Sequence, residues 1–210
     1  MKIYNSTILI DLEHSEEDIW KSLHKVTRND IRRAKKKGVV VIKDHDLKYL
    51  KDCHRLYCLM CERNLIPQPS LEQFKKKIEK AKKGVMLVAL FKNKAVSFMY
   101  IGEWDLKPAI GALKHNATDF NYKELQPNSL LYWDTVLTMK DMGFKYCNLA
   151  GLDLGTGDAH LKNINRFKRR WNGVEIIVPV DVSLFEWIYW KFLRRFRIIR
   201  HIKYKWQMRS

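Results

Sequence analysis

A segment near the C-terminal end of the sequence, residues 144–173, places the tightest limits on how the chain folds. Its apolar start, residues 144–149, predicts a short buried strand. Gly151, Gly155 and Gly157 come next and predict a loop, because glycine adopts backbone angles that are closed to other residues. The segment therefore predicts a strand that leads through a glycine loop into the next element.

The element after this loop is predicted to be a strongly basic helix. Asp158 is its expected N-cap, and residues 174–178 predict the strand that follows the helix. The helix has no acidic residue, and its basic residues are Lys162, Arg166, Lys168, Arg169 and Arg170. A glycine loop that leads into a basic helix can hold an anion or a developing oxyanion. An ordinary connection with a solvated basic face explains the same pattern, and the sequence leaves both interpretations open.

The composition indicates a folded protein with an anionic partner. The 210 residues are 46% hydrophobic and 12% aromatic, which suits a single large domain with a sizeable core and excludes a disordered chain. The net charge is +17 and the isoelectric point about 9.7. This balance favours binding to nucleic acid, to an acidic membrane surface or to a phosphate-rich substrate.

The cysteines and the N-terminal residues indicate where the protein works. Cys58 and Cys61 form a single C-x-x-C motif without a second pair, and we interpret them as core thiols, with a zinc or redox site as the alternative. No disulfide framework is predicted, which suits a reducing compartment. The sequence has neither a signal peptide nor the roughly 20 apolar residues of a membrane span. We therefore expect a cytoplasmic protein, either soluble or peripheral at the inner membrane face.

The N-terminal part of the sequence predicts a strand followed by a long helix. Residues 6–12 are rich in Ile and Leu and predict the strand, and residues 15–37 predict the helix. The second half of this helix is crowded with basic residues, among them Arg28 and Arg32, and has Asp30 as its one acid. Like charges four residues apart repel each other on a helix. We therefore consider phosphate binding by Arg28 and Arg32 beside the alternative of a solvated face.

The rest of the chain alternates between strands and helices. Further strands are predicted at residues 39–42, 85–91, 95–102 and 108–113. Further helices are predicted at residues 47–63, 71–82 and 127–143. A tight turn at residues 92–94 joins two of the strands. This order predicts an α/β fold in which helices cover a mixed, mostly antiparallel sheet.

The last segment, residues 183–210, differs in kind from the rest. It holds three of the seven tryptophans and eight basic residues against Glu186. On a helical wheel its aromatic and aliphatic residues fall on one side. This pattern predicts a basic amphipathic helix that contacts an anionic membrane surface or a partner, with packing on the domain as the alternative. We therefore divide the chain into a domain of residues 1–182 and a C-terminal helix of residues 183–210.

Several short motifs together resemble the FemABX family, the peptidoglycan interpeptide-bridge aminoacyltransferases. In chain order the matching residues are Leu23, Arg28-Asn29, Ile31-Arg32, Ala34, Lys37-Gly38-Val39, Glu62-Arg63, Gly111-Ala112, Pro127-Asn128, Leu130-Leu131, Trp133, Met142-Gly143-Phe144, Ala150-Gly151 and Arg166-Phe167-Lys168. The match extends over most of residues 7–180, and the order and spacing of the motifs carry it. The resemblance implies a GNAT-like acyltransferase fold, equivalent to the second of the two such domains in that family.

The resemblance also implies a reaction and roles for individual residues. The family transfers an amino acid from aminoacyl-tRNA to an amine of a peptidoglycan precursor. By resemblance, Lys168 stabilises the tetrahedral oxyanion and Arg63 contacts the precursor phosphate. Gly151 and Arg166 belong to matching motifs and are assigned to substrate binding. Asp153 is a candidate to position the acceptor amine or to act as its base, with loop hydrogen bonding as the alternative.

The sequence also departs from the pattern of this family. Ala109-Ile110 stand where the family often has an aromatic residue, and Trp171-Asn172-Gly173 replace the usual Phe-Gly-Gly after the lysine. The first domain of the family has no counterpart in this sequence, so either a partner subunit supplies part of the precursor cleft or the acceptor differs. We find no pyrophosphate loop of the kind that acetyl-CoA-using GNAT enzymes carry. We therefore assign neither a cofactor nor a metal.

Three hypotheses follow from these features. The first is a FemABX-like aminoacyltransferase that acts on a peptidoglycan or other cell-envelope precursor, with its positive charge directed at tRNA, precursor phosphate and the bilayer. The second is an N-acyltransferase that uses acyl-CoA or an acyl carrier in polysaccharide or lipid modification. The third is a non-catalytic basic module that binds nucleic acid or membrane.

Overall fold

The computed structural model describes residues 2–80, 83–104, 107–153, 159–181 and 183. Its strands are β1 (Lys2–Asp11), β2 (Val39–Asp44), β3 (Val85–Phe91), β4 (Lys94–Trp104), β5 (Lys107–Thr118), β6 (Tyr146–Leu152) and β7 (Val174–Asp181). Its helices are α1 (Glu16–Ser22), α2 (Lys25–Lys36), α3 (Leu50–Arg63), α4 (Leu71–Glu79), the 3-10 helix η1 (Phe120–Leu125), α5 (Pro127–Asp141) and α6 (Ala159–Arg169).

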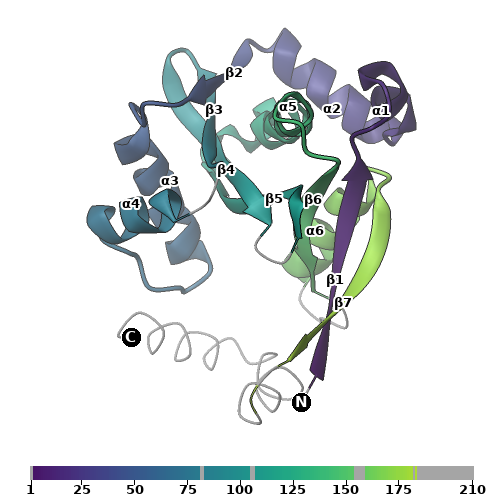
Figure 1. Cartoon of the computed structure of the whole chain (residues 1–210). Coiled ribbons are helices and arrows are strands. Elements are labelled where there is room, and N and C mark those ends of the chain that lie inside the picture. The colour runs from purple at the N-terminus through teal and green to yellow at the C-terminus, as the bar shows by residue number, and fades with distance from the viewer. Residues whose placement is uncertain (1, 81–82, 105–106, 154–158, 182, 184–210) are drawn as a thin grey trace.

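The strands form one seven-stranded sheet in the order β2-β3-β4-β5-β6-β1-β7 (Figure 1). Every neighbouring pair is antiparallel except β5 and β6, which run parallel and are joined through α5. Parallel neighbours need such a crossover helix. The mixed, mostly antiparallel sheet with flanking helices that the sequence predicts is therefore confirmed.

Helices cover both faces of the sheet, because its central strands carry apolar side chains on both sides (Figure 1). In β3, Met86 and Val88 belong to the core under α3 and α4. The alternating residues Leu87 and Ala89 belong to the larger core under α1, α2 and α5. This arrangement follows from the period of two in a strand.

The pairing of β5 with β6 is short and depends on a glycine. Ile110 to Ala112 of β5 pair with Tyr146 to Asn148 of β6, and no other described residues of the two strands pair. A Cβ atom at Gly111 would lie 2.8 Å from Sδ of Met139 and 2.9 Å from Cδ2 of Phe144. Gly111 therefore lets α5 and Phe144 pack closely on the sheet at the point where the parallel strands meet.

The prediction of one helix over residues 15–37 is wrong, because the chain forms α1 and α2 with a break between them. Leu23 and His24 have extended ψ angles of 143° and 142°. The guanidinium group of Arg28 donates to the carbonyl oxygen of Lys21 at 2.7 Å and also to that of Leu23. These two hydrogen bonds pair carbonyl oxygens at the end of α1 that have no partner within the helix, and they therefore stabilise the break.

The tight turn predicted at residues 92–94 is confirmed. Lys92 and Asn93 have φ angles of 49° and 59°, and Phe91 pairs with Lys94. Two successive left-handed residues make the two-residue turn that matches the twist of a β-hairpin, and asparagine tolerates this conformation well.

The C-terminal helix predicted over residues 183–210 lies outside the described residues, apart from Ser183. The division of the chain at residues 182 and 183 therefore stays a prediction. Among the described helices, none combines the length and the apolar character that crossing a membrane requires.

Candidate active site

The strand that leads to the site is longer than predicted. The sequence predicts a strand over residues 144–149 and a loop at Gly151, but Gly151 lies in β6 and pairs with Thr7 of β1. The first strand of the chain inserts beside β6 and extends its ladder, an effect that local sequence does not reveal. The remaining loop residues Gly155, Gly157 and the predicted cap Asp158 lie outside the described residues.

The register between β1 and β6 shifts just before Gly151, where Ala150 makes a local turn within the strand. Oδ1 of Asn148 accepts from the backbone N–H of Ala150 at 2.8 Å, and Ala150 has a left-handed φ of 63°. The hydroxyl of Thr7 lies 2.5 Å from Asn148 Oδ1 and 2.9 Å from the carbonyl oxygen of Ala150. A non-glycine residue at this angle is strained and needs support from its surroundings, which Asn148 and Thr7 provide.

Lys168 of α6 points into this turn. Its ammonium donates to the carbonyl oxygen of Gly151 at 2.8 Å, and the residue is 7% exposed. Removal from water disfavours the charged form and lowers the pKa of Lys168 to about 8. Within the described part of the chain, no carboxylate lies within salt-bridge distance of this ammonium. The site thus holds a buried cation with donors to spare, which suits an anion that forms during a reaction.

A second contact ties α6 to the end of β6. Asn165 is buried, and its side-chain amide donates to the carbonyl oxygen of Asp153 at 2.8 Å and accepts from the Asp153 N–H at 3.1 Å. Asn165 and Lys168 are three residues apart and therefore share one face of α6. The backbone of Asp153, predicted as a site residue, is thus held by a residue one helical turn before Lys168.

Aromatic packing holds the other side of α6 in place. The Tyr132 ring of α5 lies 5.0 Å from the ring of Phe167 and 5.6 Å from that of Trp171. Trp171 is buried, and a Cβ atom at Gly173 would lie 2.4 Å from the backbone oxygen of Leu9. The Trp171-Asn172-Gly173 sequence that departs from the family pattern therefore anchors the end of α6 against α5 and β1.

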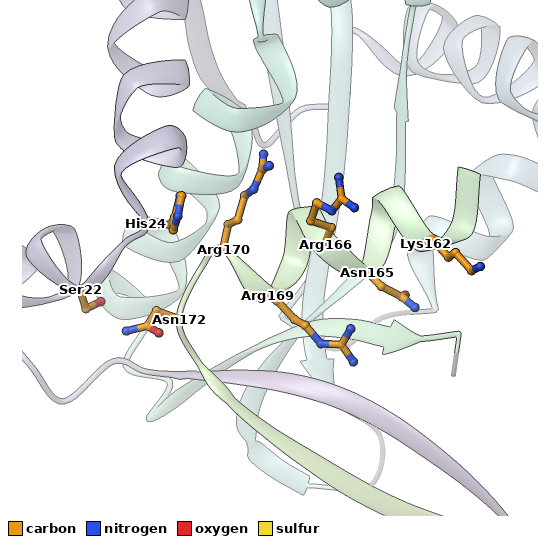
Figure 2. A pocket seen from close by; sticks show the side chains of 8 residues that line it. All are labelled: Ser22, His24, Lys162, Asn165, Arg166, Arg169, Arg170 and Asn172. Atoms are coloured by element: carbon orange, nitrogen blue, oxygen red, sulfur yellow. The ribbon is translucent and has the colours of Figure 1, made fainter. Parts of the chain in front are cut away.

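The exposed face of α6 borders a groove of about 610 Å³ (Figure 2). The opposite wall is the junction between α1 and α2, which contributes Ser22 and His24. The remaining lining residues are Lys162, Asn165, Arg166, Arg169, Arg170 and Asn172. Arg166 was predicted to bind substrate, and the structure places it in this groove.

The other predicted basic residues lie elsewhere. The Arg28 guanidinium caps α1, and that of Arg32 lies 5.4 Å from the centre of the Trp20 ring. Arg63 ends α3 on the other face of the sheet, where it donates to the carbonyl oxygen of Thr118 at 3.1 Å. The structure therefore brings Lys168 and Gly151 into contact, holds Asp153 through Asn165, and places Arg166 in the adjoining groove. None of the three arginines of α2 and α3 lines that groove.

Sequence reasoning missed Thr7, Asn148 and Asn165. Thr7 is 141 residues away from Asn148 along the chain, so only the sheet topology brings them together. Asn165 carried a usable signal in the sequence, because it follows Leu161 by four residues and so falls on the apolar side of the predicted helix, where a polar side chain needs a specific partner.

Comparison with known proteins places the fold. The sequence matches no family model and no curated protein. The crystal structure of FemX matches with a TM-score of 0.69 at 11% identity over 88% of this chain. The C-terminal domain of a lysylphosphatidylglycerol synthetase from Agrobacterium fabrum matches with a TM-score of 0.62 at 11% identity over 85% of this chain. A GCN5-related glucosamine N-acetyltransferase region of a fungal GH3 beta-N-acetylglucosaminidase matches with a TM-score of 0.53 at 15% identity. This match covers 64% of this chain and 17% of that chain.

The fold is the GNAT-like fold of FemX. This result confirms the fold expected from the resemblance to the FemABX family, at a level of identity that shows the fold alone. The chain spans 63% of the FemX chain and 60% of the Agrobacterium domain. Activity and substrates are therefore matters for proposal, since a shared fold hosts many functions.

Proposed function

We propose that the protein is an acyltransferase that moves an aminoacyl group from aminoacyl-tRNA to an amine of a peptidoglycan or other cell-envelope precursor. The observation that carries the proposal is the ammonium of Lys168, buried at the end of β6 and hydrogen-bonded to Gly151. The likeness to FemX and to a lysylphosphatidylglycerol synthetase domain supports this direction. The second of these names also brings a lipid hydroxyl into consideration as acceptor.

In the proposed reaction, the acceptor amine attacks the carbonyl carbon of the aminoacyl ester. The C=O π electrons move to oxygen, and the resulting oxyanion is stabilised by the Lys168 ammonium. Collapse of the intermediate breaks the bond to the ribose oxygen, which takes the proton that the amine loses. We assign this proton transfer to the carboxylate of Asp153, a residue whose backbone is held by Asn165, one helical turn before Lys168.

Lys168 stays mostly protonated at neutral pH despite its burial, as this task requires. With a pKa of about 8, roughly nine tenths of the side chains are protonated at pH 7. A cation in a site shielded from water stabilises developing negative charge more strongly than it would in bulk solvent. Because the oxyanion exists only in the transition state and the intermediate, this interaction accelerates the chemical step.

The proposal is tested by offering purified protein charged tRNA, acyl-CoA and a pool of envelope precursors, and reading the products by mass spectrometry. Transfer of an aminoacyl mass from charged tRNA is expected. Lys168→Ala is expected to lower kcat on the order of 10²–10³-fold, as removal of an oxyanion donor does. Lys51→Ala removes the same charge from an exposed position on α3 and serves as the matched control.

Two results would contradict the proposal. Full activity of a folded Lys168→Ala variant would remove the oxyanion role of this lysine. Transfer from acyl-CoA alone would show that aminoacyl-tRNA is not the donor and would favour an acyl-CoA-dependent N-acyltransferase. That second candidate is supported by the likeness to the N-acetyltransferase region.

A partner that supplies a counterpart of the first FemABX-type domain belongs to the same proposal. The chain spans 63% of FemX, so a second subunit could complete the acceptor cleft. Co-purification from the native host, followed by the same transfer assay, tests this point. Transfer at full rate by the isolated chain would show that no such subunit is needed.

A further inference from the structure

The groove between α6 and the α1–α2 junction concentrates positive charge. Lys162, Arg166, Arg169 and Arg170 line one wall, and among the described residues no Asp or Glu lines the groove (Figure 2). Arg169 is engaged by Glu175 at 3.0 Å. For Lys162 and Arg166, both exposed, the described part of the chain offers no carboxylate within salt-bridge distance.

This arrangement is unfavourable for the helix by itself. Lys162 and Arg166 are four residues apart on α6. Arg170 directly follows the helix and is four residues after Arg166, to whose carbonyl oxygen its backbone N–H donates, so two pairs of like charges lie close together. The described helix contains no acidic residue that would relieve the repulsion. An anionic ligand along this face would relieve it.

The wall opposite α6 adds a hydrogen-bond donor. Nδ1 of His24 accepts from the backbone N–H of Val26 at 3.2 Å, so the proton of a neutral His24 ring lies on Nε2. Figure 2 shows His24 across from Arg170. The backbone N–H of His24 donates to the carbonyl oxygen of Arg170 at 3.0 Å, which fixes the two walls relative to each other.

The groove also adjoins the candidate active site. Asn165 lines the groove and at the same time holds the backbone of Asp153. A chain that passes along the groove can therefore reach the end of β6, where Lys168 lies. Basic residues four apart on a helix are separated by about 6 Å along its axis, which suits successive phosphates of a chain better than the adjoining phosphates of a pyrophosphate.

We propose that this groove binds the phosphate backbone of a single RNA strand whose acylated end reaches Lys168. The inference rests on the proposed function and adds to it the surface on which the donor lies. Phosphate contacts position a nucleic acid without reading its sequence, and a concave basic groove with polar side chains suits such a backbone. A flat anionic bilayer fits a recessed groove less well than a strand does.

The test measures binding of a short labelled single-stranded RNA to the full chain over a range of salt concentrations. The double variant Lys162→Gln/Arg166→Gln is expected to bind this RNA at least about tenfold more weakly at low salt. Each lost phosphate contact lowers the slope of log affinity against log salt by about 0.7, so the slope should fall by about 1.4. Lys51→Gln/Lys76→Gln removes two exposed positive charges from α3 and α4 and should leave both quantities unchanged.

Separate arms distinguish this inference from the proposed function. In the transfer assay the Lys162→Gln/Arg166→Gln variant should raise KM for charged tRNA and leave kcat unchanged, while Lys168→Ala lowers kcat. If the groove variant binds RNA like the native protein while Lys168→Ala still abolishes transfer, the groove assignment is wrong and the function stands. A groove variant that loses binding to CoA, or to phosphatidylglycerol vesicles, and keeps RNA binding would overturn the inference in favour of that ligand.

Discussion

The ammonium of Lys168 lies 2.8 Å from the carbonyl oxygen of Gly151, on a turn that Ala150 forms with a φ of 63°. The lysine is therefore held by backbone and not by a carboxylate of the described chain. A counterion would neutralise the cation before a substrate arrived. A carbonyl dipole orients it and leaves its charge available.

The position of Lys168 predicts a specific dependence of stability on pH. Its pKa is lowered from 10.5 to about 8 in the folded protein, so between these values the unfolded chain binds more protons than the folded one. The free energy of unfolding should therefore rise with pH from about 8 to about 10.5, by on the order of 3 kcal/mol for this group. Comparing native protein with Lys168→Met by urea unfolding at several pH values isolates this contribution from those of cysteines and tyrosines.

The same comparison gives a second readout. Methionine has a similar length and no charge to desolvate, so Lys168→Met should be at least as stable as the native protein at pH 7 and lack transfer activity. A difference in stability that stays constant across the pH range would contradict the depressed pKa.

Asn165 is predicted to support both stability and activity. Asn165→Ala removes two hydrogen bonds to the backbone of Asp153, one of them donated and one accepted. Leaving those part-buried backbone groups without partners should lower the free energy of unfolding by about 1 kcal/mol, measured by urea unfolding. The kcat should fall as well, since α6 loses one of its two ties to β6.

Asn163→Ala is the matched control, because Asn163 lies on the same helix and is exposed. It should change neither quantity. An Asn165→Ala variant with unchanged kcat would show that Lys168 is positioned by the aromatic packing of α6 alone.

Replacing Gly173 or Gly111 by alanine is predicted to destabilise the protein to different degrees. A Cβ at Gly173 would lie 2.4 Å from the backbone oxygen of Leu9, whereas at Gly111 the nearest atom is Sδ of the flexible Met139 side chain at 2.8 Å. Gly111→Ala should therefore cost about 1–3 kcal/mol by overpacking, and Gly173→Ala more, because backbone moves less readily than a methionine. Thermal unfolding of both variants tests the ranking, and equal losses would contradict it.

Arg28 is predicted to act on the structure of the α1–α2 junction. Its guanidinium bonds to the carbonyl oxygens of Lys21 and Leu23, so Arg28→Ala should lower the free energy of unfolding by about 1–2 kcal/mol. The KM for the acceptor should stay unchanged in the folded variant. Lys36→Ala on the exposed face of α2 controls for the loss of charge, and a raised KM in Arg28→Ala alone would return this residue to substrate binding.

The parts of the fold that the sequence predicted depend on short-range rules. The turn at Lys92 and Asn93 and the helix that begins at Pro127 are fixed by neighbouring residues. Lys168 was proposed through a resemblance and Asp153 through a glycine pattern, and both contact the segment at the junction of β6 and α6. Their roles stay predictions. The break between α1 and α2 was missed, because the hydrogen bonds of Arg28 override a continuous helical pattern.

The features that were not predicted depend on distant pairs. The extension of β6 to Leu152 requires β1 as its neighbour, and no periodicity within residues 144–153 indicates that neighbour. The roles of Thr7 and Asn148 depend on the same pairing. The sequence could indicate the chemistry that the residues of the candidate site offer, but not which distant segments of the chain surround them.

The insertion of β1 between β6 and β7 also determines when the site can exist during synthesis. Thr7 cannot form its hydrogen bond until Asn148 has been synthesised. Ser6 likewise depends on Glu175, 169 residues later in the chain, to which its hydroxyl donates. Contacts of such sequence separation close late in folding, because a long loop must first be brought together. The earlier strands can pair while the ribosome is still extending the chain, but the end of the sheet that carries the candidate site assembles only after β7 has emerged. A product truncated before β7 would therefore fold in part and lack the contacts that shape this site.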